Sequence, residues 1–173
     1  MELLQFAYFS RQKEGVIGVD VVEEMLQASK NNFIEAEKLN PWFKSEFVKL
    51  LKGDALHLPI DDKSIDVAAQ NCLFNIFKHE ELKLALKEMY RVLKPGGHIV
   101  LVIANNTIAG RTFRTPAYMA RIAAACGLTV TACFIDAIRS RGLMTKRNHT
   151  ASMITREWIF LFTKGDVLSG VRS

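Results

Sequence analysis

This 173-residue sequence lacks long apolar runs and has few cysteines. No apolar stretch approaches the roughly 20 residues that a membrane-spanning helix needs, so we expect no membrane span. The first five residues lack the basic segment of a secretory signal. The three cysteines, at positions 72, 126 and 133, are an odd number without close pairing, which predicts reduced thiols in a cytoplasmic protein and no metal site.

Acidic residues also become scarce after residue 100. Residues 1–100 hold 13 Lys and Arg against 15 Asp and Glu, whereas residues 101–173 hold 10 against 3. A basic segment of this kind marks a nucleic-acid surface or a solvated loop. Its candidate phosphate contacts are Arg139, Arg141, Lys146 and Arg147. No aromatic residue stands in residues 139–150 to stack on a base, so a solvated hairpin tip is the alternative.

The order of apolar segments predicts an α/β fold. A hydrophobic content of 49% is enough for one packed domain, which we expect over residues 1–165, with a frayed tail over 166–173. Helices are expected over 1–11, 22–39, 79–93 and 115–126, and strands over 15–20, 47–51, 65–70, 98–103, 128–138 and 154–163. Alternation of short strands with helices predicts a mostly parallel sheet covered on both faces. The last two strands would add an antiparallel hairpin.

Two acidic residues follow the first two expected strands. Asp20, followed by Val21, ends the first strand, where a carboxylate can accept hydrogen bonds from both hydroxyl groups of a ribose. The alternative is that Asp20 is the N-cap of the next helix. Asp54 follows Gly53, where its carboxylate can accept an adenine amino group while the backbone of Ala55 binds a ring nitrogen. Gly-Asp is also an ordinary turn pair. The two acids together predict an adenosine site.

The segment after the third strand is the candidate catalytic loop. It begins with Asn71 and Cys72, and a thiolate is a good ligand for soft metals and metalloids. A buried, unreactive cysteine is the alternative for Cys72. Phe74 and Phe77 favour core or pocket lining. Residues 94–97, Lys-Pro-Gly-Gly, predict a sharp turn from helix to strand in which glycine supplies a positive φ.

These motifs together resemble the class I S-adenosylmethionine-dependent methyltransferases. Over residues 1–100 the chain is most similar to arsenite methyltransferases of the arsenosugar type, above all in the run Asn-Cys-Leu-Phe-Asn-Ile-Phe at residues 71–77. The resemblance implies that Asp20 holds the ribose of S-adenosylmethionine, that Asp54 and Ala55 hold the adenine, and that Asn71 and Cys72 lie beside the methyl donor, with arsenite as the acceptor.

From about residue 102 the chain instead resembles the end of a DNA amino-methyltransferase. The segments that carry this resemblance are 103–108, 139–147 and 154–158. It implies methylation of an amino group on a nucleic acid, or a non-catalytic basic fragment that binds nucleic acid. The change of resemblance and the change of charge predict a join of two pieces near residues 100–104.

The methyltransferase resemblance also implies a central first strand and a glycine-rich loop ahead of residue 1. Neither is present in this sequence. The strands over 16–19 and 65–70 must then pair with each other or keep open edges, and open edges invite association with another chain. We therefore expect either a damaged cofactor site or a homo-oligomer that fills the gap.

Overall fold

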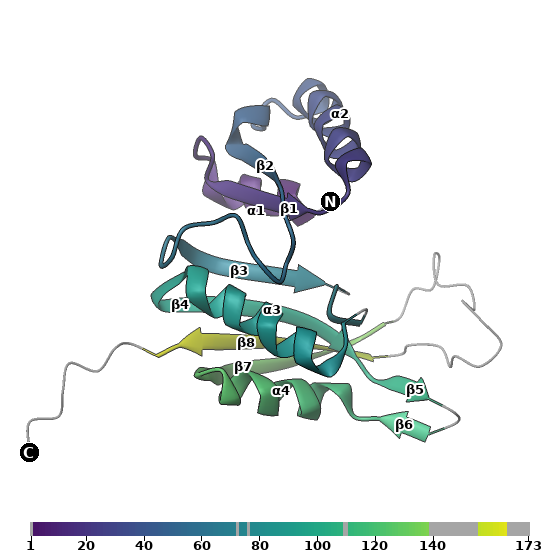
Figure 1. The fold of residues 1–173 in the computed structure, drawn as a ribbon. Helices are drawn as coiled ribbons and strands as arrows, with labels where there is room; N and C mark the ends of the chain where they lie inside the picture. The colour runs from purple at the N-terminus through teal and green to yellow at the C-terminus, as the bar shows by residue number, and fades with distance from the viewer. Residues whose placement is uncertain (1, 72, 76, 109–110, 139–155, 166–173) are drawn as a thin grey trace, which may run out of the picture. The chain divides into compact units, whose positions relative to one another are not determined.

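The computed structural model describes residues 2–71, 73–75, 77–108, 111–138 and 156–165 (Figure 1). The chain forms two compact units, Met1–Pro59 and Ile60–Ser173. We call them the N-terminal unit and the C-terminal unit. No helix in the described ranges is both long and apolar enough to cross a membrane.

The N-terminal unit packs two helices on a two-stranded sheet. Its elements are α1 (Glu2–Ser10), β1 (Val16–Asp20), α2 (Glu23–Leu39), the 3-10 turn η1 (Ser45–Phe47) and β2 (Val48–Lys52). β1 and β2 pair in parallel, with Val16 opposite Val48 and Asp20 opposite Lys52. Six buried side chains form the core: Ala7, Val16, Phe33, Ala36, Phe43 and Val48.

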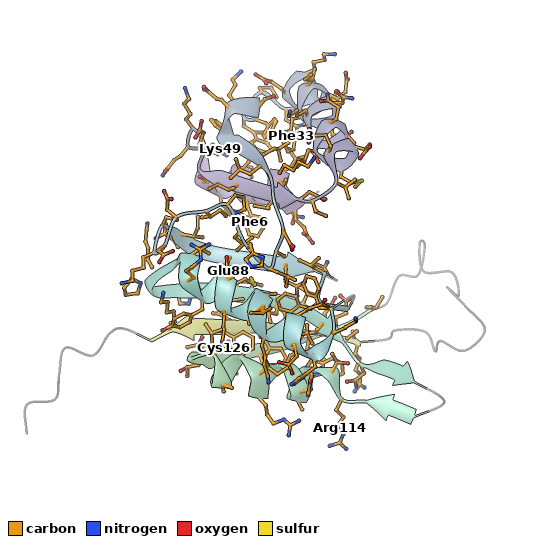
Figure 2. All side chains as sticks on the ribbon, in the orientation of Figure 1. Phe6, Phe33, Lys49, Glu88, Arg114 and Cys126 are labelled. Carbon is orange, nitrogen blue, oxygen red and sulfur yellow. The ribbon has the colours of Figure 1, made fainter. Side chains whose placement is uncertain are left out.

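Helix α1 lies close to β1 because residue 18 is glycine. A Cβ atom on Gly18 would lie 2.8 Å from a methyl carbon of Leu3 and 2.9 Å from a methyl carbon of Leu50. Any side chain there would push the helix off the strand. In the same unit, Phe33 on α2 belongs to the aromatic core (Figure 2), with its ring centroid 5.8 Å from that of Phe43.

The C-terminal unit is built on a mixed four-stranded sheet in the order β3-β4-β8-β7. Its elements are β3 (Ile65–Asn71), the 3-10 turn η2 (Leu73–Asn75), α3 (His79–Val92), β4 (Leu93–Ala104), β5 (Asn106–Ile108), β6 (Arg111–Phe113), α4 (Thr115–Ala125), β7 (Leu128–Ala137) and β8 (Arg156–Lys164). β3 and β4 are parallel, and the pairs β4–β8 and β7–β8 are antiparallel. The predicted C-terminal hairpin is therefore confirmed.

Helices α3 and α4 cover the same face of this sheet (Figure 1). The apolar stripe of α3 is buried as its periodicity predicts, through Leu82, Ala85, Leu86 and Met89. The sheet residues beneath the helices are the alternate residues of β4 and β8: Ile99, Leu101, Ile103, Phe160 and Phe162. On the opposite face, no described helix of this unit packs against the sheet.

Two local predictions need correction, and one element was not predicted. The pair Thr115-Pro116 predicts a helix cap followed by proline at the first helical position, but Thr115 is the first residue of α4 and the cap position is Arg114. The strand expected from residue 98 begins at Leu93, directly after the helix. The short hairpin β5–β6 was not predicted, because three-residue strands leave too little periodicity to detect.

The predicted turn at residues 94–97 is instead the irregular start of β4, and both glycines have a role in it. Gly96 has a φ of 74°, which is the left-handed region that glycine adopts without strain. A Cβ on Gly97 would lie 2.9 Å from the carbonyl oxygen of Lys94 and 3.1 Å from that of Asp66. Gly97 is thus required for the close approach of β3 to this part of β4.

The strands β1 and β3 do not pair with each other. Among the described residues, β1 pairs with β2 alone and β3 pairs with β4 alone. That the outer edges of these strands are open stays a prediction. The single domain over 1–165 and the join near 100–104, a position that β4 spans, stay predictions.

Candidate functional site

The two candidate acids lie at the same edge of the β1–β2 sheet. The backbone N–H of Gly53 donates to the carbonyl oxygen of Asp20 at 3.0 Å, which continues the pairing of the two strands one residue beyond Lys52. Asp54 is the next residue. Neighbouring strands lie about 4.8 Å apart, and each residue of a strand adds about 3.3 Å. These spacings place the Cα atoms of Asp20 and Asp54 within roughly 10 Å of each other.

Each acid is held by a bond to its own turn. Oδ1 of Asp20 accepts from the backbone N–H of Val22 at 2.9 Å, and Oδ1 of Asp54 accepts from that of Leu56 at 2.9 Å. These bonds fix the side-chain directions of both acids. The cap position of α2 is Val22 and not Asp20, so the N-cap alternative does not account for this acid. A carboxylate has about four acceptor positions, so both groups can accept further donors.

The neighbours of the two acids differ in exposure. Val21 is 64% exposed, which is unusual for a valine between a strand and a helix. Ala55 is half-buried. Gly53 has a structural reason to be glycine, because a Cβ there would lie 2.5 Å from the Cδ atom of Pro59 and 3.1 Å from Cγ1 of Val19. The turn after β2 therefore folds back tightly over the end of β1.

The candidate catalytic loop belongs to the C-terminal unit. Asn71 is the last residue of β3, lies opposite Val102 and is exposed. Cys72 lies outside the described residues. Phe74 is buried, and its ring centroid is 6.1 Å from that of Phe77. This agrees with the expectation that the loop's aromatic residues serve packing.

A histidine and a tyrosine that the sequence did not single out meet beside this loop. His79 is the first residue of α3, and Tyr118 lies in the first turn of α4. Nδ1 of His79 and the hydroxyl of Tyr118 form a hydrogen bond, and Nε2 of His79 lies 3.7 Å from the Glu80 carboxylate. The sequence could have indicated His79 by its position just after the loop. Its partner Tyr118 is 39 residues away, so no local sequence pattern indicates that the two side chains meet.

The remaining predicted residues are basic side chains and cysteines. Arg139, Arg141, Lys146 and Arg147 lie outside the described residues, so contact with nucleic acid stays a prediction. Cys126 and Cys133 are both free thiols. Cys126 stands at the end of α4 (Figure 2), and burial raises the pKa of its thiol. No group of three potential metal ligands occurs among the residues that the structure describes.

Comparison with known proteins gives the chain a family. The sequence pattern of a methyltransferase domain matches residues 3–101. An uncharacterized methyltransferase of Schizosaccharomyces pombe is 35% identical over 99 residues, which are 56% of this chain and 34% of that protein. An arsenite methyltransferase of Halobacterium salinarum is 33% identical over 50% of this chain and 20% of its own length. A demethylmenaquinone methyltransferase of Staphylococcus aureus is 39% identical over 49% of this chain and 31% of its own length.

The chain thus spans about a third or less of the curated relatives that it matches. Solved structures extend the likeness in fold over more of it. A SAM-dependent methyltransferase of Methanosarcina mazei covers 87% of this chain and 82% of its own, with a TM-score of 0.66 at 17% identity. A [4+2]-cyclase covers 87% of this chain and 66% of its own, with a TM-score of 0.64 at 18% identity. The second structure shows that the fold alone does not decide the reaction.

The expected fold class is confirmed by these structures: a Rossmann-like α/β fold with a C-terminal antiparallel hairpin. The family pattern and the fold together imply S-adenosylmethionine as the cofactor. Since the family pattern covers more than half of the sequence, this chain belongs to the methyltransferase-domain family.

Proposed function

We propose that the N-terminal unit binds the adenosyl half of S-adenosylmethionine and that the chain is an S-adenosylmethionine-dependent methyltransferase. The observation that carries the proposal is the pairing of β1 with β2, which brings Asp20 and Asp54 to one edge of the sheet. In open α/β sheets, ligands bind at the carboxyl ends of the strands. Two carboxylates held there in fixed turns suit the hydroxyl and amino donors of a nucleoside.

In this proposal each residue has one role. Asp20 accepts hydrogen bonds from the ribose hydroxyls, and Asp54 accepts from the amino group of adenine. The backbone N–H of Ala55 donates to a ring nitrogen, and Gly53 lets the turn pass close to the ligand. The exposed side chain of Val21 covers a face of the base, which gives its 64% exposure a reason.

The methionine half of the cofactor has fewer candidate contacts. Ahead of β1, residues 2–15 contain one glycine, Gly15, and form α1 and a turn. The contacts that we propose for the described residues are therefore those of the adenosine half.

Calorimetric titration with adenosine and with S-adenosylmethionine tests the proposed adenosine site. Asp20→Asn and Asp54→Asn should each weaken adenosine by about ten- to a hundredfold, because a bond to a charged acceptor contributes about 1.5–3 kcal/mol. Glu24→Gln, an exposed acid in the first turn of α2, is the matched control and should change nothing.

Two results would contradict the proposed adenosine site. In the first, adenosine does not bind at millimolar concentration. In the second, it binds both Asp variants as tightly as the unmodified chain.

For the methyl acceptor we propose trivalent arsenic, with Cys72 as its thiolate ligand and Asn71 beside it. The support is the run at residues 71–77 and the similarity to an arsenite methyltransferase. Methyl transfer is an in-line displacement at carbon, so the chain's task is chiefly to hold the two reactants in line. Transfer of labelled methyl to arsenite supports this acceptor, and no transfer to arsenite excludes it. Transfer that persists in Cys72→Ala excludes Cys72 as the arsenic ligand.

The His79–Tyr118 pair favours a second candidate, an acceptor that must lose a proton. A histidine that is hydrogen-bonded to a phenol and flanked by a carboxylate is a suitable general base. One relative, named for demethylmenaquinone, is a methyltransferase of a different acceptor. Labelled transfer to a hydroquinone, together with a pH optimum that shifts in His79→Gln, would favour this candidate over arsenite.

A further inference from the structure

We propose that Tyr118 is the residue that takes the proton from the methyl acceptor, and that Tyr118 passes its own proton to His79. This inference rests on the second candidate of the proposed function, an acceptor that must lose a proton, and it names the catalytic group. All members of this proton relay belong to the C-terminal unit. The support is the hydrogen bond between the two side chains, their charged neighbours and the helices that carry them.

Two helices hold the pair in place. His79 is the first residue of α3, where the backbone N–H of Lys78 donates to the Glu81 carboxylate at 2.7 Å. Tyr118 lies in the first turn of α4, and its backbone N–H donates to the carbonyl oxygen of Arg114 at 3.2 Å. Both helices bury apolar side chains in the C-terminal unit. The two side chains are therefore carried by rigid elements, as a catalytic pair requires.

The neighbours of His79 decide which of the two side chains donates. Nδ1 of His79 faces the hydroxyl of Tyr118, and Nε2 lies 3.7 Å from the carboxylate of Glu80. An ionised carboxylate has no proton to donate, so it favours the neutral imidazole that carries its proton on Nε2. Nδ1 is then the acceptor, and the hydroxyl of Tyr118 is the donor. The imidazole of His79 is thus able to accept the proton of Tyr118.

Two features favour negative charge on the Tyr118 oxygen as its proton leaves. The guanidinium carbon of Arg121 lies 5.8 Å from the centroid of the Tyr118 ring, within the range of a cation–π contact. Tyr118 also stands at the N-terminal end of α4, where the helix dipole favours an anion. A hydroxyl, an imidazole that accepts its proton and a carboxylate at the other nitrogen form an activated group. Glu80 contributes least, because its side chain is 79% exposed.

In the proposed step the acceptor loses one proton and gains one methyl group. The acceptor hydroxyl gives its proton to the oxygen of Tyr118, while Tyr118 gives its own proton to Nδ1 of His79. A bond forms between the acceptor oxygen and the methyl carbon that S-adenosylmethionine supplies, and the carbon–sulfur bond breaks with its electron pair on sulfur. The imidazolium then loses a proton to water, which reaches the 47% exposed side chain of His79. The relay therefore serves a hydroxyl compound such as a hydroquinone.

Nitrogen NMR spectra of the isotope-labelled full chain test the hydrogen bond without methyl transfer. In mildly alkaline solution, Nδ1 of His79 should be the ring nitrogen without a proton, and Nε2 should carry it. The spectrum of His79→Gln assigns the signals. Tyr118→Phe keeps the ring and removes the hydroxyl, so it should move the Nδ1 signal. Tyr90→Phe removes a hydroxyl from α3 and is the matched control, which should leave that signal in place.

Transfer of labelled methyl to a hydroquinone tests the reaction. Tyr118→Phe and His79→Gln should each lower kcat by about a hundredfold or more and change KM much less, because general acid–base catalysis contributes about 10²–10⁴-fold. The double variant should lose no more than the larger single loss, because both residues serve one proton path. Glu80→Gln should cost about fivefold or less. Tyr90→Phe should retain full transfer.

Three results would overturn the relay. A proton on Nδ1 of the neutral His79 ring would reverse the hydrogen bond, and the unmodified chain alone decides this point even where a variant fails to fold. Full transfer by Tyr118→Phe would exclude Tyr118 as the catalytic group. Losses that multiply in the double variant would mean two separate effects instead of one path. The expected spectrum without any transfer to the hydroquinone would refute the hydroxyl acceptor, and with it the second candidate function, but not the hydrogen bond.

Discussion

Replacing Lys164 by methionine should destabilise the C-terminal unit by about 2–3 kcal/mol. Lys164 ends β8 and is 5% exposed. Its Nζ donates to the carbonyl oxygens of Tyr90 at 2.8 Å and Leu93 at 2.7 Å, and lies 4.2 Å from the centroid of the Tyr90 ring. The side chain thus joins β8 to the last turn of α3 and the start of β4, where a helix leaves carbonyl groups unsatisfied.

The magnitude follows from two opposing contributions. Two hydrogen bonds from a charged donor contribute about 1.5–3 kcal/mol each, so their loss costs roughly 3–6 kcal/mol. Methionine fills a similar volume and removes the cost of burying an ammonium group, which recovers part of this loss. The two carbonyl groups remain without a donor in the variant. We therefore expect the net loss to stay clearly above 1 kcal/mol.

Urea unfolding followed by Trp158 fluorescence in a Trp42→Phe background measures this loss in the C-terminal unit. Lys94→Met is the matched control, because Lys94 also makes two bonds, to Asp66, but its side chain is 46% exposed. An exposed ion pair contributes about 0–1 kcal/mol. Equal losses in the two variants, or a gain in Lys164→Met, would refute the reasoning.

The same residue predicts a dependence on pH. Burial, and to a lesser degree the charge of Lys63, lowers the pKa of Lys164 in the folded protein. The folded chain then binds this proton less tightly than the unfolded chain. The stability of the unmodified protein should rise as the pH increases from the lowered pKa toward the ordinary value of 10.5. Lys164→Met should lack this rise, and an equal rise in both proteins would contradict the assignment.

Three further predictions concern other parts of the chain. Gly53→Ala should destabilise the N-terminal unit by about 1–3 kcal/mol in urea unfolding followed by Trp42, because its Cβ would lie 2.5 Å from the Pro59 ring; no loss would mean that the turn moves freely. Hydrogen bonds from the Ser45 hydroxyl and backbone N–H, with Lys44 nearby, lower the pKa of the Glu37 carboxyl group. The contribution of Glu37 to folding stability is therefore present above pH 4.5 and is lost as the pH falls through the lowered pKa. Glu37→Gln should show a weaker loss of stability on acidification in the same assay. Iodoacetamide labelling followed by mass spectrometry should modify exposed Cys133 before Cys126, whose pKa burial raises; the reverse order would contradict the burial.

The paired acids show how far local patterns reach. Asp20 and Asp54 each follow a short apolar segment, and the rule that ligands bind at strand ends was enough to select both. Only the structure shows that β1 and β2 are neighbours, with Asp20 opposite Lys52. Contacts between residues that are far apart in the sequence follow no such rule. His79 and Tyr118 are 39 residues apart, and Lys164 meets the end of α3 across more than 70 residues.

By itself the sequence determined the elements and their class. The period of the apolar residues set α3, and Gly127, with its positive φ, set where α4 ends. Only the tertiary structure decided which strands are neighbours and that β8 lies between β4 and β7. The physical reason is that periodicity and turn chemistry act between residues a few positions apart. The pairing of strands is decided by burial and hydrogen bonding between segments that the sequence keeps far apart.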